Sequence, residues 1–194
     1  GIFNTGSLTL RNVHVTNNDA DTNGAGIFNG GDLTVIDSTV SANVSGGTGG
    51  GIENGVAGIL SVINSTISGN SAASDGAGIF NSGTASLTNV TVAANTGSGL
   101  LQDATGTFTL SNTISAGSSG GDATGTFIGN AFNLIEDAAL ATGFSGSDLT
   151  GVSPMLGMLA DNGGPTPTHA LLTGSPAIDA GSDALALDEL GLPL

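Results

Sequence analysis

Apolar and polar positions alternate in short bursts that recur along the first half of the chain. Each burst is an apolar–polar–apolar triplet followed, after a bend, by a second short strand; the triplets are Leu8-Thr9-Leu10, Leu33-Thr34-Val35, Leu60-Ser61-Val62, Ala85-Ser86-Leu87 and Phe108-Thr109-Leu110. The phrase Gly-Ile-Phe-Asn or Gly-Ile-Glu-Asn begins at Gly1, Gly26, Gly51 and Gly78, with spacings of 25, 25 and 27 residues. Strands and Gly/Asn turns that repeat with a period in the twenties are typical of a β-solenoid. We therefore expect an all-β fold, a right-handed parallel β-helix of about five to six coils.

The alternation within each strand predicts which side chains face the core. Coils that stack about 4.8 Å apart bring equivalent residues into columns, so a column of aliphatic residues forms a continuous dry interior. The triplets supply one inward column, and the second strands supply another. The expected core residues are Leu10, Val35, Val62, Leu87 and Leu110 from the triplets, and Val15, Val40, Ile67, Val92 and Ile114 from the second strands.

Asparagine recurs at the bends between strands. One column consists of Asn12, Asp37, Asn64, Asn89 and Asn112, and two further columns are Asn4, Asn29, Asn54, Asn81 and Asn18, Asn43, Asn70, Asn95. A stacked amide can donate a hydrogen bond to the coil on one side and accept one from the other. We interpret these residues as structural ladders and not as ligand sites.

The repeat ends in the second half of the chain. From about residue 137 the pattern gives way to Pro- and Gly-rich loops, and all but one of the five prolines lie in Val152–Asp179. Because the open strand edges at the end of a solenoid need a cover, this tail is expected to be a cap. We expect one structural domain, with coils in residues 1–136 and a cap in residues 137–194 packed on the last coil.

The charge is strongly acidic. One Arg and no Lys stand against 16 Asp and Glu, which gives a formal net charge of −15. Such a surface repels phosphate backbones and anionic lipids, and no apolar run reaches the length of a membrane span, so neither nucleic-acid binding nor membrane insertion is expected. The chain starts in mid-coil at Gly1, and we therefore expect further coils before it or head-to-tail self-association; a surface ligand is not identified by the sequence.

Two stretches resemble known protein families. The coil sequence GIFNSGTASLTNVTVAAN resembles the parallel β-helix repeats of bacterial surface proteins, among them polymorphic outer membrane protein-like repeats. The tail sequences GNAFNLI and SDLTGVSPMLGMLADNGGPTPTHALLTGSPAIDAG resemble the ending of the choice-of-anchor Q domain family. This resemblance implies an extracellular or cell-surface protein without established catalysis.

Residues suited to catalysis are scarce. A polysaccharide lyase needs a basic residue near a uronate, and a glycoside hydrolase needs two carboxylates on one face. The chain has no Lys or Tyr and one Arg, while Asp32, Asp37 and Glu53 are scattered over bends. His14 replaces a threonine in an outward column, and His169 is expected to satisfy a backbone group. We expect a non-enzymatic extracellular structural or adhesive protein, a stiff stalk or filament subunit, with a lyase or hydrolase as the less favoured alternative.

Two other patterns suggest binding chemistry. Asp19, Asp21 and Asn23 place oxygen ligands at alternate positions before Gly24, as in the opening of a calcium loop, although the final Glu of such a loop is absent. Apart from this candidate calcium site, no cofactor is expected. The outward hydroxyl pairs suggest an ice-binding face as an alternative function; they are Thr39/Ser41, Thr66/Ser68 and Thr113/Ser115.

Overall fold

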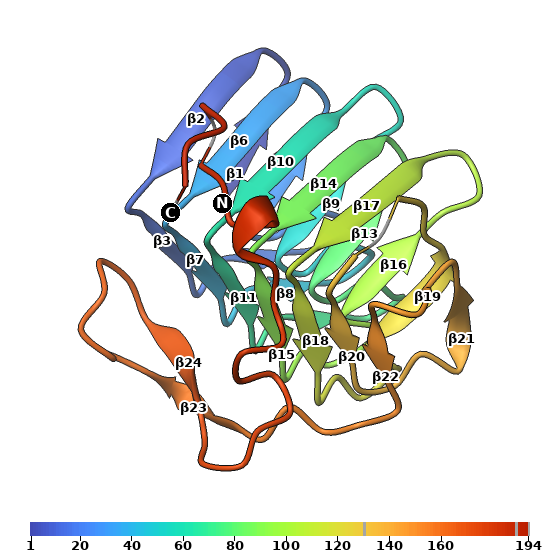
Figure 1. Ribbon diagram of the computed structural model, residues 1–194. Helices are drawn as coiled ribbons and strands as arrows, with labels where there is room; N and C mark the ends of the chain where they lie inside the picture. Colours follow the sequence, from blue (N-terminus) through green and yellow to red (C-terminus); the bar gives the residue numbers. More distant parts are fainter. Residues whose placement is uncertain (130, 189, 194) are drawn as a thin grey trace.

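The computed structural model describes residues 1–129, 131–188 and 190–193 and confirms a parallel β-solenoid (Figure 1). Its strands stack into three long parallel sheets and one short one. Sheet A contains β1 (Ile2–Asn4), β5 (Ile27–Asn29), β9 (Ile52–Asn54), β13 (Ile79–Asn81), β16 (Leu100–Gln102), β19 (Ala123–Thr126) and β21 (Leu140–Thr142). Sheet B contains β2 (Ser7–Arg11), β6 (Asp32–Ile36), β10 (Ile59–Ile63), β14 (Thr84–Thr88) and β17 (Thr107–Ser111).

The remaining strands form the third long sheet, a short sheet at a corner, and a hairpin. Sheet C contains β3 (His14–Thr16), β7 (Thr39–Ser41), β11 (Thr66–Ser68), β15 (Thr91–Ala93), β18 (Ile114–Ala116), β20 (Leu134–Ile135) and β22 (Leu149–Thr150). Sheet D contains β4 (Asp19–Ala20), β8 (Val44–Ser45) and β12 (Ser71–Ala72). The antiparallel hairpin β23 (Leu156–Ala160) and β24 (Thr168–Leu171) lies in the tail, followed by the short 3-10 helix η1 (Asp183–Leu185).

Aliphatic columns fill the interior between sheets A, B and C. Val35, Val62, Leu87 and Leu110 are at most 1% exposed, and so are Val40, Ile67 and Val92 in the second column. Val15 is 8% exposed, and Leu10 is only partly buried. Both residues lie in the first coil, which has a neighbouring coil on one side. At the other end the core continues as a stack of Phe108, Phe127 and Phe144, whose successive ring centroids are 5.3 and 5.4 Å apart.

The register of β18 corrects the assignment of three residues. Ile114 pairs with Thr91 and Ser115 pairs with Val92, so Ile114 faces outward and Ser115 faces the core. The sequence-based prediction had placed Ile114 in the core, and Thr113 and Ser115 outside it. The reason is that the bend residue Asn112 is followed by one connecting residue, Thr113, as in every earlier coil. A shift of one position reverses which face each side chain occupies.

The amide ladders exist, but the bend column differs from the expectation. In the interior column Asn4 donates to Asn29, Asn29 to Asn54 and Asn54 to Asn81, with Nδ2–Oδ1 distances of 2.7–2.8 Å, and Asn81 donates to Gln102. The second column runs unbroken from Asn18 to Asn95. In the bend column, amide contacts join only two pairs: Asn64 to Asp37 and Asn112 to Asn89.

Backbone conformation explains why Asn and Asp occupy that bend. Asn12, Asp37, Asn64, Asn89 and Asn112 all have positive φ, between 47° and 55°. Asn and Asp tolerate this left-handed conformation better than other non-glycine residues. The repeated bend therefore depends on local backbone preference more than on a continuous amide ladder.

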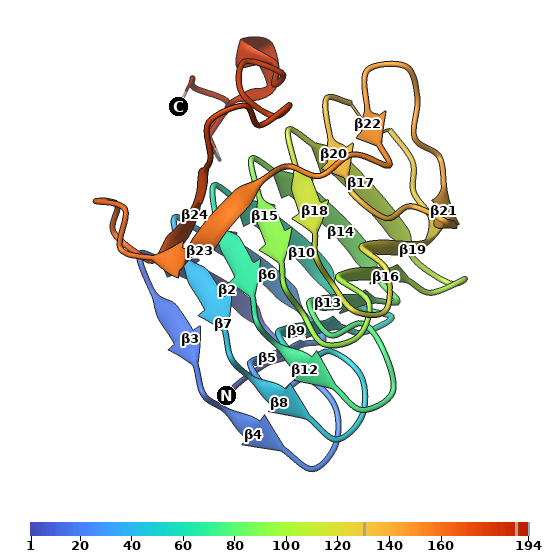
Figure 2. The same cartoon turned by 90° about the horizontal axis from the view of Figure 1, so that it is seen from below.

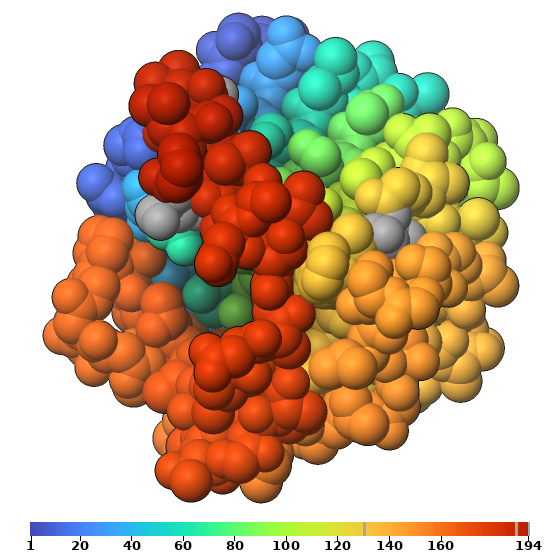
Figure 3. All heavy atoms as spheres, in the orientation of Figure 1, coloured from blue at the N-terminus to red at the C-terminus, as the bar shows by residue number. Residues whose placement is uncertain are grey.

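The tail does not pack as expected. Strands β21 and β22 continue sheets A and C, so the coils extend to Thr150 instead of ending at residue 136. The segment after Thr150 then runs back along the outside of sheet C, as Figures 2 and 3 show. It reaches β7, where the Thr39 hydroxyl donates to the Pro167 carbonyl at 2.7 Å. The tail is thus a lateral strap across the solenoid, and Phe144 packs at the end of the core.

Candidate functional site

The outer face of sheet C carries two columns of side chains that the sequence singled out. The first is His14, Thr39, Thr66, Thr91 and Ile114, and the second is Thr16, Ser41, Ser68, Ala93 and Ala116. Hydroxyl groups therefore dominate the first coils; the second column becomes apolar at β15 and the first at β18. We call this surface the hydroxyl face.

The strap covers most of the hydroxyl face. Thr39, Ser41, Thr66 and Ser68 are 0–4% exposed. Besides the bond between Thr39 and Pro167, the Thr166 hydroxyl donates to the Asp37 carbonyl at 3.3 Å. An ice-binding surface must present its hydroxyls to water, and these are buried under protein. The prediction of an ice-binding surface formed by these residues is therefore wrong for this face, and Thr113 and Ser115 lie inside the solenoid.

His169 attaches the hairpin to the hydroxyl face. Its Nδ1 lies 2.7 Å from the Gly157 carbonyl oxygen, and its Nε2 lies 2.8 Å from Ser68 Oγ. A carbonyl only accepts, so in the neutral imidazole Nδ1 carries the proton and Nε2 accepts from Ser68. The expectation that His169 satisfies a backbone group is confirmed. A serine beside a histidine also resembles an activated nucleophile, but Ser68 is 3% exposed, so the pair is positioned as a latch.

His14 has a comparable partner on the same face. Its Nε2 lies 2.7 Å from Ser41 Oγ, while the residue as a whole stays exposed. The sequence analysis treated His14 as a solvated replacement for threonine. The contact with Ser41 adds a hydrogen bond between β3 and β7, which no sequence pattern identifies.

The candidate calcium loop has other partners. Asn23 Nδ2 donates to Glu53 Oε1 at 3.1 Å, and Asn23 Oδ1 accepts from the Thr48 amide at 3.1 Å. Asp19 and Asp21 lie exposed on the surface. Across the described ranges there is no group of three or more His, Asp or Glu side chains arranged to hold a metal ion. The Asn23 side chain therefore links neighbouring coils, and the calcium site at Asp19, Asp21 and Asn23 stays a prediction.

Asp122 is a buried carboxylate that the sequence analysis did not identify. It is 1% exposed, and its two oxygens accept from the backbone amides of Ser118 and Asp137 at 2.8 and 2.9 Å. Burial raises the pKa of Asp122 above its ordinary value, although these hydrogen bonds oppose the shift. A signal was present in the sequence, because Asp122 occupies the position that is glycine in every earlier coil. With both oxygens bonded to backbone, the carboxylate joins two turns and is not presented to a substrate.

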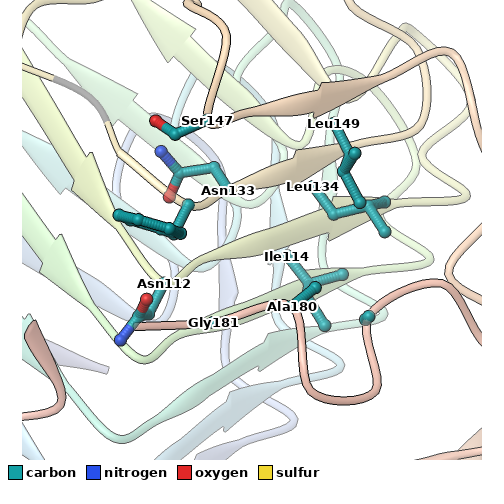
Figure 4. Close-up of a pocket in the computed structure, with 10 residues that line it drawn as sticks. Asn112, Ile114, Asn133, Leu134, Ser147, Leu149, Ala180 and Gly181 are labelled. Atoms are coloured by element: carbon teal, nitrogen blue, oxygen red, sulfur yellow. The ribbon is translucent and has the colours of Figure 1, made fainter. Parts of the chain in front are cut away.

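A small cavity lies where the strap meets the last coils (Figure 4). Ile114, Leu134 and Leu149 line it from sheet C, and Ala177 and Ala180 line it from the strap. Its volume is about 80 Å³, far below the size of a typical ligand pocket. We interpret it as a packing gap beneath the strap.

Part of the outer face of sheet B remains accessible, although Ile36 and Ile63 on that face are only 2% and 7% exposed. Its central column consists of Thr9, Thr34, Ser61, Ser86 and Thr109, which are exposed or half-buried. The column beside it is mixed, with Asp32 and Ile59 among hydroxyl residues. Sheet B, and not sheet C, is thus the side of the solenoid that presents hydroxyl groups to solvent.

No match was found when the chain was compared with models of known protein families, with curated proteins and with solved structures. Among the described residues, no helix has the length and apolar character needed to cross a membrane. Function must therefore be argued from the geometry.

Proposed function

We propose that this chain is a non-enzymatic structural or adhesive element of an extracellular or cell-surface protein, a stiff β-helical stalk. The observation that carries the proposal is the continuity of its coil-to-coil contacts. The core columns run through the solenoid, and the interior amide ladder joins five successive coils from Asn4 to Gln102. A rod in which each coil bonds to the next resists bending and local opening.

The acidic groups are consistent with this role. Two of them, Glu53 and Asp122, are buried and hold neighbouring segments together: Glu53 accepts from Asn23 and Thr48, and Asp122 joins two turns. The tail sequence resembles the ending of choice-of-anchor Q domain proteins, and the coil sequence resembles the β-helix repeats of bacterial surface proteins; both resemblances support an extracellular location. Net charge of −15 favours solubility outside the cell and discourages binding to anionic polymers.

Limited proteolysis with a broad-specificity protease tests the proposed stiffness. We expect cleavage to be confined to the strap, with the coils through Thr150 recovered as a resistant fragment identified by mass spectrometry. Degradation of the coils at the same rate as the strap would contradict a stalk role. Activity screens against pectin, alginate and related polysaccharides are expected to give no turnover, and turnover that a single Asp→Asn change abolishes would show an enzyme.

Exposure of the sheet B column favours ice binding as a second candidate function. Regular hydroxyl groups on a flat β-face can order water, and Thr34, Ser61 and Ser86 stand in three successive coils. Thermal hysteresis that Ser61→Tyr abolishes and Thr66→Tyr does not would support it. We favour the structural role because Asp32 and Ile59 interrupt the adjacent column.

A further inference from the structure

The strap hairpin presents an apolar outer face to solvent. Met158 in the middle of β23 is 87% exposed, Leu172 is 48% exposed and Met155 is 44% exposed. Ala160 and Ala170 are exposed on the same two strands. The inner side, in contrast, contributes His169 to the contact with Ser68. One side of the hairpin is thus bound to the solenoid, and the other side lacks a partner in the described chain. We call this outer surface the Met158 patch.

A groove opens beside the Met158 patch, between the hairpin and sheet C. It has a volume of about 310 Å³. Ala93, Ala94 and Ala116 line it from the solenoid, and Leu156 and Met158 line it from the strap. The groove exists because the outward column of sheet C changes from serine to alanine at β15, so no large side chain fills the space. An apolar knob and an apolar hole therefore lie side by side on one surface.

The charge distribution shows what kind of partner fits this surface. Val152–Ala160 and Asn162–Ile178 contain no Asp, Glu, Lys or Arg, although the whole chain has a net charge of −15. Asp161, directly after β23, is the one charged residue between these two ranges. Another copy of so acidic a chain is therefore repelled less at this surface than at a surface of average charge. Glu136 is the one carboxylate that lines the groove, and its Oε2 accepts from the Gly117 amide at 3.1 Å.

We propose that the Met158 patch is a two-fold interface between copies of this chain, in which Met158 of each copy enters the groove of the other. A two-fold interface uses the same surface twice, so it requires a knob and a hole on one face. Methionine suits the knob because its unbranched thioether adapts to irregular apolar space. Two solenoids would then lie side by side through their straps, and each strap would be held between the two rods. The inference does not depend on the stalk role, because it concerns association alone.

Sedimentation velocity on the full chain, from about 10 µM to about 1 mM, tests the proposal over the range in which small apolar interfaces associate. We expect a reversible dimer for the wild type. Met158→Asp should abolish the dimer. The matched control is Val56→Asp, because Val56 is also largely exposed, at 76%, and lies outside the patch; this variant should dimerise like the wild type. Wild-type circular dichroism and melting temperature must be retained in both variants.

Disulfide trapping tests the geometry without introducing a charge. The chain has no cysteine, so each engineered cysteine is unique. A mixture of Met158→Cys protein and Ala94→Cys protein should form a mixed disulfide under mild oxidation, whereas Val56→Cys mixed with Ala94→Cys should not. A monomer at every concentration, a dimer that Met158→Asp leaves intact, or equal trapping by Val56→Cys would each overturn the proposal.

Discussion

Asn54 offers the sharpest test of the interior amide ladder. It is fully buried in β9, accepts from Asn29 Nδ2 at 2.8 Å and donates to Asn81 Oδ1 at 2.7 Å. Its Nδ2 also lies 3.2 Å from the carbonyl oxygens of Gly58 and Thr84. Because one amide has only two N–H bonds, these contacts amount to two donated bonds and one accepted bond.

Replacing Asn54 with Leu keeps a similar volume and removes all three bonds. At about 1 kcal/mol net for each bond, the loss is about 3 kcal/mol, and buried groups left without a partner raise it to about 3–5 kcal/mol. The change also removes the side-chain amide bonds through which β9 connects β5 to β13, while the backbone pairing of these strands remains. We therefore expect weaker coupling between the first and later coils. Urea denaturation followed by circular dichroism measures both the loss of stability and any splitting of the transition.

Asn12→Gly is the matched control for this prediction. Asn12 is exposed and has a positive φ of 54°, which glycine adopts without strain. We expect this change to alter stability by less than about 0.5 kcal/mol. If Asn54→Leu lowers the free energy of unfolding by less than about 1 kcal/mol while the fold is retained, the amide ladder does not supply the stability estimated above.

Four further outcomes follow from the structure. Truncation of Val62 or Ile67 to Ala should cost about 2–5 kcal/mol in denaturant titrations, and Ile114→Ala clearly less, because Ile114 faces outward and is only partly buried. His169→Ala should release the strap, seen as faster hydrogen exchange in β23 and β24 with little change in the coils, and Ser68→Ala should have the same effect if their bond is the latch. The raised pKa of Asp122 means that the folded state binds its proton more tightly than the unfolded state, so this group should add stability as the pH falls through its folded pKa towards 3.8. Asp122→Asn should remove that component of the melting-temperature profile. Calcium should raise the melting temperature slightly by screening the net charge of −15, and the rise should persist in the Asp19→Asn/Asp21→Asn variant; its loss there would indicate a defined site.

Periodicity in the sequence predicted the coils because the solenoid repeats one local environment. Val35, Val62 and Leu87 face the core in identical register, so one correct assignment fixes its neighbours. The same logic fails where the repeat shifts. Its apolar character predicts that Ile114 faces the core, whereas its distance from the bend at Asn112 places it on the outer face. Counting from the positive-φ residue gives the correct face in each of these coils.

The strap was not predictable in the same way. Its hydrogen bonds with the solenoid join residues 70 to 129 positions apart, such as Asn112 with Ser182 and Asp37 with Thr166. They involve side chains or carbonyl groups with no repeating pattern. The Pro-rich composition of Val152–Asp179 indicated only that the repeat had ended. An end cap and a lateral strap satisfy that composition equally well, and the choice between them depends on long-range packing.

The strap also explains why the hydroxyl face is buried although its sequence predicts exposure. Threonine and serine in an outward column read as solvent-exposed, yet a hydroxyl can donate to a strap carbonyl as readily as to water. Thr39 donates to the Pro167 carbonyl, and Ser68 pairs with the His169 ring. Where the strap no longer makes such contacts, the column changes to Ala93 and Ala116, and the groove beside Met158 begins. The switch from hydroxyl to methyl therefore marks where hydrogen bonds between sheet C and the strap give way to apolar packing, and where the groove proposed to bind a second copy begins.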